Sequence, residues 1–114
     1  MRPGQLQPNE FELAILELLA NKWPELRPLI GQLHVLSREF TGVCSYTNFR
    51  SQESASELAD HDLGLEEHIE MPNVPNGMGA VLFCENGMPK FLETFTYGDF
   101  WDGLFDGYTI VTSA

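Results

Sequence analysis

The sequence has few cysteines, no long apolar run and almost no basic residues in its second half. Its two cysteines, Cys44 and Cys84, are too few for a disulfide framework. Because each lies in an apolar stretch, we expect both thiols to be reduced and buried. No apolar run approaches the roughly 20 residues of a membrane span, and residues 1–12 lack the apolar stretch of a signal peptide. These absences favour a cytoplasmic protein.

Basic residues are scarce, and their distribution divides the chain in two. The 114 residues include 6 basic and 17 acidic ones, for a formal net charge of −11. Five bases balance five acids in residues 1–51, whereas Lys90 alone opposes twelve acids in residues 52–114. This charge repels nucleic-acid phosphates and anionic membranes, so we predict neither as a partner. It would attract a basic protein; the alternative is that it only keeps the protein soluble.

Motifs with a defined chemistry are also missing. The chain has no Ser-His-Asp order, glycine-rich phosphate loop or nucleophile elbow. His61 and His68 lie among acids that could hold a divalent metal, but no HxH, HExxH or CxxC spacing is present. A solvated acidic surface is the better interpretation of these histidines. We therefore predict no metal, no cofactor and no catalytic residue, and we favour a protein that is not an enzyme.

Two N-terminal helices are expected at the start of a single domain that spans residues 1–114, with residues 1–8 loose. Asn9 and Glu12 have the spacing of an N-cap and its capping-box partner. Trp23-Pro24 ends the first helix, because a residue before proline avoids the helical conformation. A short second helix should follow over residues 24–31. Glu12 lies off the apolar stripe of the first helix, which is formed by Phe11, Ala14, Ile15, Leu18 and Leu19.

The rest of the chain has strand patterns. Residues 33–40 and 43–49 alternate with period two, and Gly42 is either a bulge in one long strand or part of a hairpin turn. Asn86-Gly87 is the preferred pair for a two-residue hairpin turn. The sequence therefore predicts an α+β fold, with two N-terminal helices packed on an antiparallel sheet of about five strands. Further strands are expected over 65–71, 80–84, 88–97 and 108–112, with loops over 50–62, 72–77 and 98–107.

Glu93 is the most informative acid in this pattern. The hairpin turn sets Glu85 opposite Met88, which places Ala80 opposite Glu93. A carboxylate buried on that face would have a raised pKa and could act as a general acid or base. The alternatives are that this end of the face is solvated, or that Arg38 neutralises Glu93. The face also holds the apolar residues Ala80, Leu82, Phe91 and Phe95.

The neighbours Arg38 and Glu39 should point to opposite faces of the sheet, since they are adjacent in a strand. A Glu39–Glu93 pair would suggest acid/base hydrolysis, although no spacing fixes their distance. Pro89, which has no N–H to donate, indicates a free edge or a bulge in the hairpin. The opposite face of the hairpin is apolar too, so either a loop or a partner subunit could cover it.

The segment 97–107 is the best surface candidate, because it mixes aromatic, acidic and glycine residues. Tyr97 and Trp101 could anchor a partner, with Asp99 and Asp102 facing a basic one. The alternative is that the rings of this segment fold inward and cap the end of the sheet.

Two pairs of sequence segments resemble known proteins. The first pair is REFTGV and SYTNF, within residues 38–49, and the second is LFCENG and FLETFTYG, within residues 82–98. They resemble small bacterial proteins of unknown function, over roughly residues 24–110, so we expect a bacterial origin. Cys44 stands where that pattern often has glycine. The resemblance implies no activity. In size, acidity and build the chain is also similar to the immunity proteins that neutralise bacterial toxins, a likeness of class rather than of motif.

The leading hypothesis is a non-catalytic acidic protein that binds a basic protein partner, as an immunity protein does. The first alternative is a small enzyme or ligand-binding domain built on Glu93 with Arg38. The second is a structural subunit that forms a homodimer through the second apolar face of its sheet. The candidate binding residues are Arg38, Glu39, Glu93, Tyr97, Asp99, Trp101 and Asp102.

Overall fold

A computed structural model of the protein describes residues 7–50 and 62–112. Helix α1 (Glu10–Lys22) begins at the predicted capping box. The Asn9 side chain accepts a 2.8 Å hydrogen bond from the Glu12 amide, and the Glu12 carboxylate accepts one of equal length from the Asn9 amide. The helix ends at Trp23, before Pro24, as predicted. The short 3₁₀ helix η1 (Pro24–Leu26) and the one-turn helix α2 (Arg27–Ile30) then occupy the predicted 24–31 segment.

In the described residues seven strands follow and form one antiparallel sheet, so the predicted fold class is confirmed, although about five strands were expected. The strand order is β1-β2-β6-β5-β4-β7, and β3 pairs with β5. The long strand β5 has β6 along one edge, and β3 and β4 share the other. The strands are β1 (Val35–Phe40), β2 (Cys44–Phe49), β3 (Asp62–Gly64), β4 (His68–Met71), β5 (Val74–Glu85), β6 (Met88–Thr96) and β7 (Thr109–Val111).

The turns resolve or correct several expectations. Gly42, with a φ of 97°, lies in the turn of a β1–β2 hairpin, so it is not a bulge in one long strand. The predicted connector 72–77 was wrong in its second part, because Met71 already pairs with Val74 across a two-residue turn. Strand β3 was not expected, and most of the predicted 50–62 loop, 51–61, lies outside the described residues.

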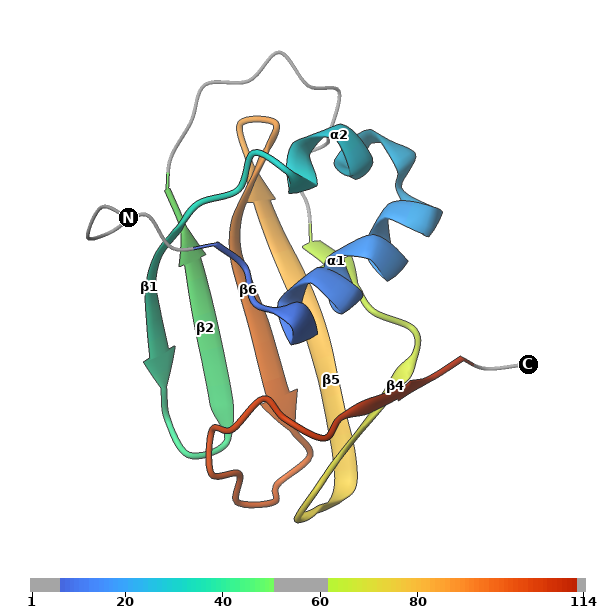
Figure 1. Ribbon diagram of the computed structural model, residues 1–114, viewed down its shortest axis with the longest axis vertical. Coiled ribbons are helices and arrows are strands. Elements are labelled where there is room, and N and C mark those ends of the chain that lie inside the picture. The colour runs from blue at the N-terminus through green and yellow to red at the C-terminus, as the bar shows by residue number, and fades with distance from the viewer. Residues whose placement is uncertain (1–6, 51–61, 113–114) are drawn as a thin grey trace.

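The helices lie on one face of the sheet, and we call this the inner face (Figure 1). The molecule measures 41 × 38 × 21 Å. Its shortest dimension is that of one sheet and one layer of helices, because such layers pack about 10 Å apart. We call the opposite side the outer face, and no described helix covers it. The core between helices and sheet centres on Phe11, Ile15, Leu16, Leu19, Leu26, Leu33, Leu63, Ile69, Met78, Leu82 and Leu92.

The β5–β6 hairpin contains the correction that matters most for function. Its turn is as predicted: Asn86 and Gly87 both have positive φ, and Glu85 pairs with Met88. A bulge then follows the Cys84–Pro89 pair, so Phe83 faces Phe91 rather than Lys90. The later pairs therefore shift by one residue, and Glu93 lies opposite Val81. Since a one-residue slip exchanges the two faces of a strand, Glu93 belongs to the outer face and not to the face of Ala80 and Leu82.

Candidate functional site

The buried acid of the described chain is Glu12 and not Glu93. Glu12 is fully buried between α1 and the inner face of the sheet, whereas Glu93 is half-buried. Arg38 points to the inner face as well and binds Glu12 twice, through Nε to Oε2 at 2.9 Å and Nη2 to Oε1 at 2.7 Å. Arg38 therefore neutralises Glu12, and the predicted pairing of Arg38 with Glu93 is not formed.

The Glu12 carboxylate is saturated with hydrogen bonds. Oε1 accepts from the Asn9 amide and from Arg38, and Oε2 accepts from Arg38 and from the Thr47 hydroxyl at 2.5 Å. Burial alone would raise the pKa of Glu12, but the hydrogen bonds from Arg38, Thr47 and Asn9 outweigh it, so the pKa lies below its usual value. A carboxylate with four donors has little capacity left to take a proton from a substrate. We interpret Glu12 as a structural clamp that ties α1 to β1 and β2.

The outer face carries a row of side chains across four strands. Glu39 on β1 is opposite Tyr46 on β2, Tyr46 is opposite Glu93 on β6, and Glu93 is opposite Val81 on β5. Tyr46 therefore stands between the two acids, and the register does not pair Glu39 with Glu93. The Glu93 carboxylate is the main cause that raises the pKa of Tyr46, with smaller effects from desolvation and from Cys44.

Aromatic rings surround this row. The Phe83 and Phe91 rings stack with their centroids 4.4 Å apart, and the Tyr46 ring approaches Phe91 at 6.1 Å. The Phe95 and Tyr97 rings meet edge to face at 5.6 Å. Four of these rings are half-buried, and Tyr97 is 58% exposed. Apolar rings are therefore accessible on a sheet face that no described helix covers.

Gly79 allows two of these side chains to approach the backbone of the sheet closely. A Cβ atom at this position would stand 2.7 Å from the Tyr97 hydroxyl and 2.8 Å from Cζ of Phe95. Such distances are far shorter than a van der Waals contact. A glycine in strand β5 thus makes room for the rings of Phe95 and Tyr97.

The charges on the outer face are acidic and lack cationic partners among the described residues. Glu39 and Glu93 are joined there by Asp62, which pairs with Phe83. The ion pairs in the described part of the chain all lie elsewhere: Lys22–Glu66, Arg38–Glu12 and Lys90–Glu85. We define the acidic aromatic patch as Glu39, Tyr46, Asp62, Phe83, Phe91, Glu93, Phe95 and Tyr97.

Three of the four candidates in the 97–107 segment hold the segment in place. Trp101 is only 1% exposed; its amide donates to Gly42 and its indole N–H to Leu104. Asp99 accepts two hydrogen bonds from Asn76, and Asp102 accepts one from the Leu104 amide. The rings of the segment are divided: Trp101 folds inward, whereas Phe100 is 73% exposed.

Sequence reasoning thus found Glu39, Glu93 and Tyr97 of the patch and missed its other members. Tyr46, Phe83, Phe91 and Phe95 lie at positions of β2, β5 and β6 that alternate with more deeply buried residues. The sequence shows these rings but not that they share one face, because that depends on the register shift between Phe83 and Cys84.

Neither a metal centre nor a membrane helix is found in the described parts of the chain. No three His, Cys, Asp or Glu residues of 7–50 and 62–112 are placed to hold a metal ion, and His61 lies outside these ranges. No helix within the same ranges is long and apolar enough to span a bilayer. No protein-family model, curated protein or solved structure matches the chain.

Proposed function

We propose that the protein is a non-catalytic binding protein that docks a basic partner protein on the acidic aromatic patch. The observation that carries the proposal is the combination of half-buried rings with three carboxylates that form no ion pair among the described residues, on a sheet face that no described helix covers. Aromatic side chains are the commonest anchors of protein interfaces. Carboxylates around them give specificity for a basic surface and speed its approach.

The charge of the patch argues against a second copy of this chain as the occupant. Two copies would each bring a net charge of −11 and face each other with Glu39, Glu93 and Asp62. Like charges brought together at an interface cost several kcal/mol. A basic protein relieves this repulsion, and a bacterial toxin is one partner of that chemistry, as the likeness to immunity proteins implies.

The enzyme alternative has less support. Glu93 stands on an open sheet face rather than in one of the described pockets, and its predicted partner Arg38 is bound to Glu12 on the other side of the sheet. A general acid or base usually acts in a cleft that excludes water. A binding role, by contrast, requires Glu93 to lie on the outer surface of the sheet, which is its position in the structure.

The test is a capture experiment with two charge-matched variants. Immobilised wild-type protein, the patch variant Glu39→Gln/Glu93→Gln and the control Glu25→Gln/Asp106→Asn are exposed to host extract, and captured proteins are then purified and titrated. We expect a basic partner that binds wild type and control alike, more weakly as salt rises, and the patch variant at least about tenfold more weakly.

Two results would contradict the proposal. One is a partner whose affinity falls equally in the patch variant and in the control, which would indicate a general effect of net charge. The other is binding that does not respond to salt. Self-association of the wild-type chain through the patch would support the homodimer instead.

A further inference from the structure

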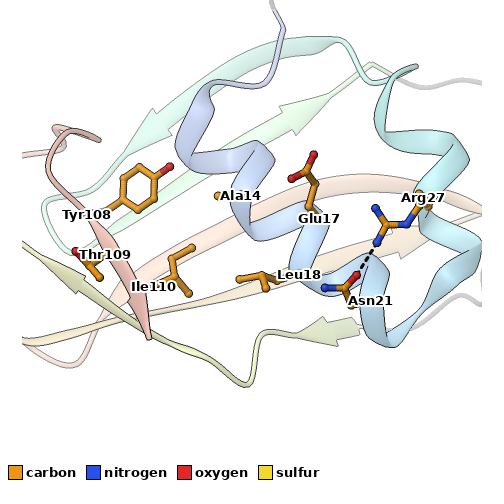
Figure 2. A pocket seen from close by; sticks show the side chains of 8 residues that line it. All are labelled: Ala14, Glu17, Leu18, Asn21, Arg27, Tyr108, Thr109 and Ile110. Carbon is orange, nitrogen blue, oxygen red and sulfur yellow. Dashed lines mark hydrogen bonds between the residues drawn. The ribbon is translucent and has the colours of Figure 1, made fainter. Parts of the chain in front are cut away.

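A groove of about 480 Å³ separates α1 from strand β7, in the helical layer and away from the acidic aromatic patch (Figure 2). Its helix side presents Ala14, Glu17, Leu18 and Asn21, which follow one another at helical spacing. Its strand side presents Tyr108, Thr109 and Ile110, and Arg27 of α2 lies at the end away from Tyr108. The volume is in the range of sites that hold a small ligand or a short peptide segment.

The strand side of this groove belongs to the last strand of the sheet. Strand β7 pairs with β4 through Ile110 opposite Ile69, and the sheet order ends there. No described strand therefore pairs with its other edge. An unpaired edge offers backbone N–H and C=O groups to an added strand, which is how many extended peptides bind.

The side chains of the groove supply an apolar floor and a cation. Leu18 and Ile110 point toward each other across it, and Ala14 leaves space between them (Figure 2). Arg27 donates a 2.6 Å hydrogen bond to the Asn21 side chain and forms no ion pair among the described residues. A guanidinium group has five N–H donors, so most of its capacity to bind a carboxylate remains.

We propose that this groove binds the free C-terminal end of an extended peptide from a partner protein. The peptide adds to β7 as a strand, its apolar terminal side chain packs between Leu18 and Ile110, and its terminal carboxylate pairs with Arg27. Glu17, on the same rim as Arg27, accepts a basic side chain shortly before the terminus (Figure 2). This pairing offsets the repulsion between Glu17 and the bound carboxylate.

Charge complementarity selects a terminus over an internal segment. In a chain of net charge −11, most surfaces repel a carboxylate, and Arg27 is a cation without an acidic partner among the described residues. The backbone of an internal segment is neutral, so such a segment could pair with Arg27 only where it carries an acidic side chain. A free C-terminus supplies the one negative group that every protein chain carries at a fixed place.

The test uses an array of hexapeptides randomised at every position, each made once with a free C-terminal carboxylate and once as the amide. Labelled wild-type protein should select free carboxylates that end in apolar residues, with lysine or arginine nearby. We expect the best peptide to bind at least about tenfold more weakly as its amide, or to Arg27→Gln. Resonances of Leu18, Arg27 and Thr109–Val111 should shift on binding.

The controls separate this site from the acidic aromatic patch. Glu39→Gln/Glu93→Gln should bind the peptide as wild type does, and Arg27→Gln should still bind the basic partner. Equal selection of carboxylates and amides, selection that survives Arg27→Gln, or no selection at all would overturn the groove proposal. None of these outcomes bears on the acidic aromatic patch.

Discussion

The two faces of the sheet use carboxylates in opposite ways. On the inner face Glu12, the single buried acid of the described residues, is held by Arg38, Thr47 and the Asn9 amide. On the outer face Glu39 and Glu93 stand among aromatic rings with no cation beside them in the described chain. A saturated carboxylate stabilises the fold, whereas an unpaired one beside exposed rings is available to a partner.

This comparison shows that net charge alone does not indicate which acids serve function. The balanced residues 1–51 contain Glu12, whose charge is cancelled inside the fold, but also Glu39, which belongs to the patch. The segment 52–114, which carries the net negative charge, contains Glu93, but also Glu66 and Glu85, which form surface ion pairs with lysines. The position of an acid relative to the sheet decides its role, and not its place in the sequence.

The largest expected effect on the free energy of unfolding comes from removing Trp101, the ring that the segment 97–107 buries. Trp101→Ala should lower the free energy of unfolding by about 3–5 kcal/mol, because it leaves a cavity against Phe40 and Phe105. Phe100→Ala, one residue away and exposed, should change it by no more than about 0.5 kcal/mol. Urea denaturation of both variants measures the difference. Equal losses would mean that the segment is not anchored by Trp101.

A smaller loss is expected when the clamp on the inner face is broken. Arg38→Gln leaves the Glu12 charge buried, which should cost about 3 kcal/mol, at the lower end of the usual range because Arg38 keeps 28% of its side chain exposed. The matched control is Glu39→Gln, the next residue on the outer face, with an expected change within about 0.5 kcal/mol. If the two variants lost the same stability, the inner and outer faces would not differ as described.

The clamp also predicts a pH dependence. The pKa of Glu12 is lowered in the folded state, because the hydrogen bonds from Arg38, Thr47 and Asn9 outweigh the effect of burial. Its stabilising contribution is therefore present above the unfolded pKa of about 4.3 and is lost as the pH falls through the lower folded value. Wild type should lose more stability than Glu12→Gln between pH 7 and pH 3 in parallel denaturation curves. Curves of equal slope would show that Glu12 is not clamped.

The smallest expected effect concerns the outer face and leaves stability unchanged. Glu93→Gln removes the charge that contributes most to the raised pKa of Tyr46, so that pKa should fall toward its usual value. NMR titration of the assigned Tyr46 ring measures it, with the distant Tyr108 as an internal reference whose pKa should not move. An unchanged Tyr46 pKa would show that Glu93 does not interact with Tyr46, and the two residues would then not belong to one patch.

Local features of the fold could be predicted from the sequence, because the residues that determine them are close along the chain. The Asn9–Glu12 capping box, the end of α1 at Trp23-Pro24 and the Asn86-Gly87 turn all depend on residues within a few positions of one another. The buried state of Glu12 could not be predicted in the same way, because its counter-charge Arg38 lies 26 positions further on.

The set of residues that shares the outer face could not be predicted from the sequence, for a related reason. Pro89 indicated a bulge, but it did not show on which strand the extra residue stands. One inserted residue was enough to assign Glu93 and the rings of β6 to the wrong face. The strand β3 is three residues long, too short for a pattern of alternation to identify.

Photo-crosslinking in the host cell tests the central claim most directly. A photoreactive phenylalanine analogue replaces Tyr46 or Phe91 in the patch, or Phe100, which is exposed in the 97–107 segment. The account predicts that both patch positions form an adduct with one basic protein, that Phe100 does not, and that Glu39→Gln/Glu93→Gln in the same chain reduces the yield. An adduct between two copies of this chain, or an adduct from Phe100 alone, would contradict it.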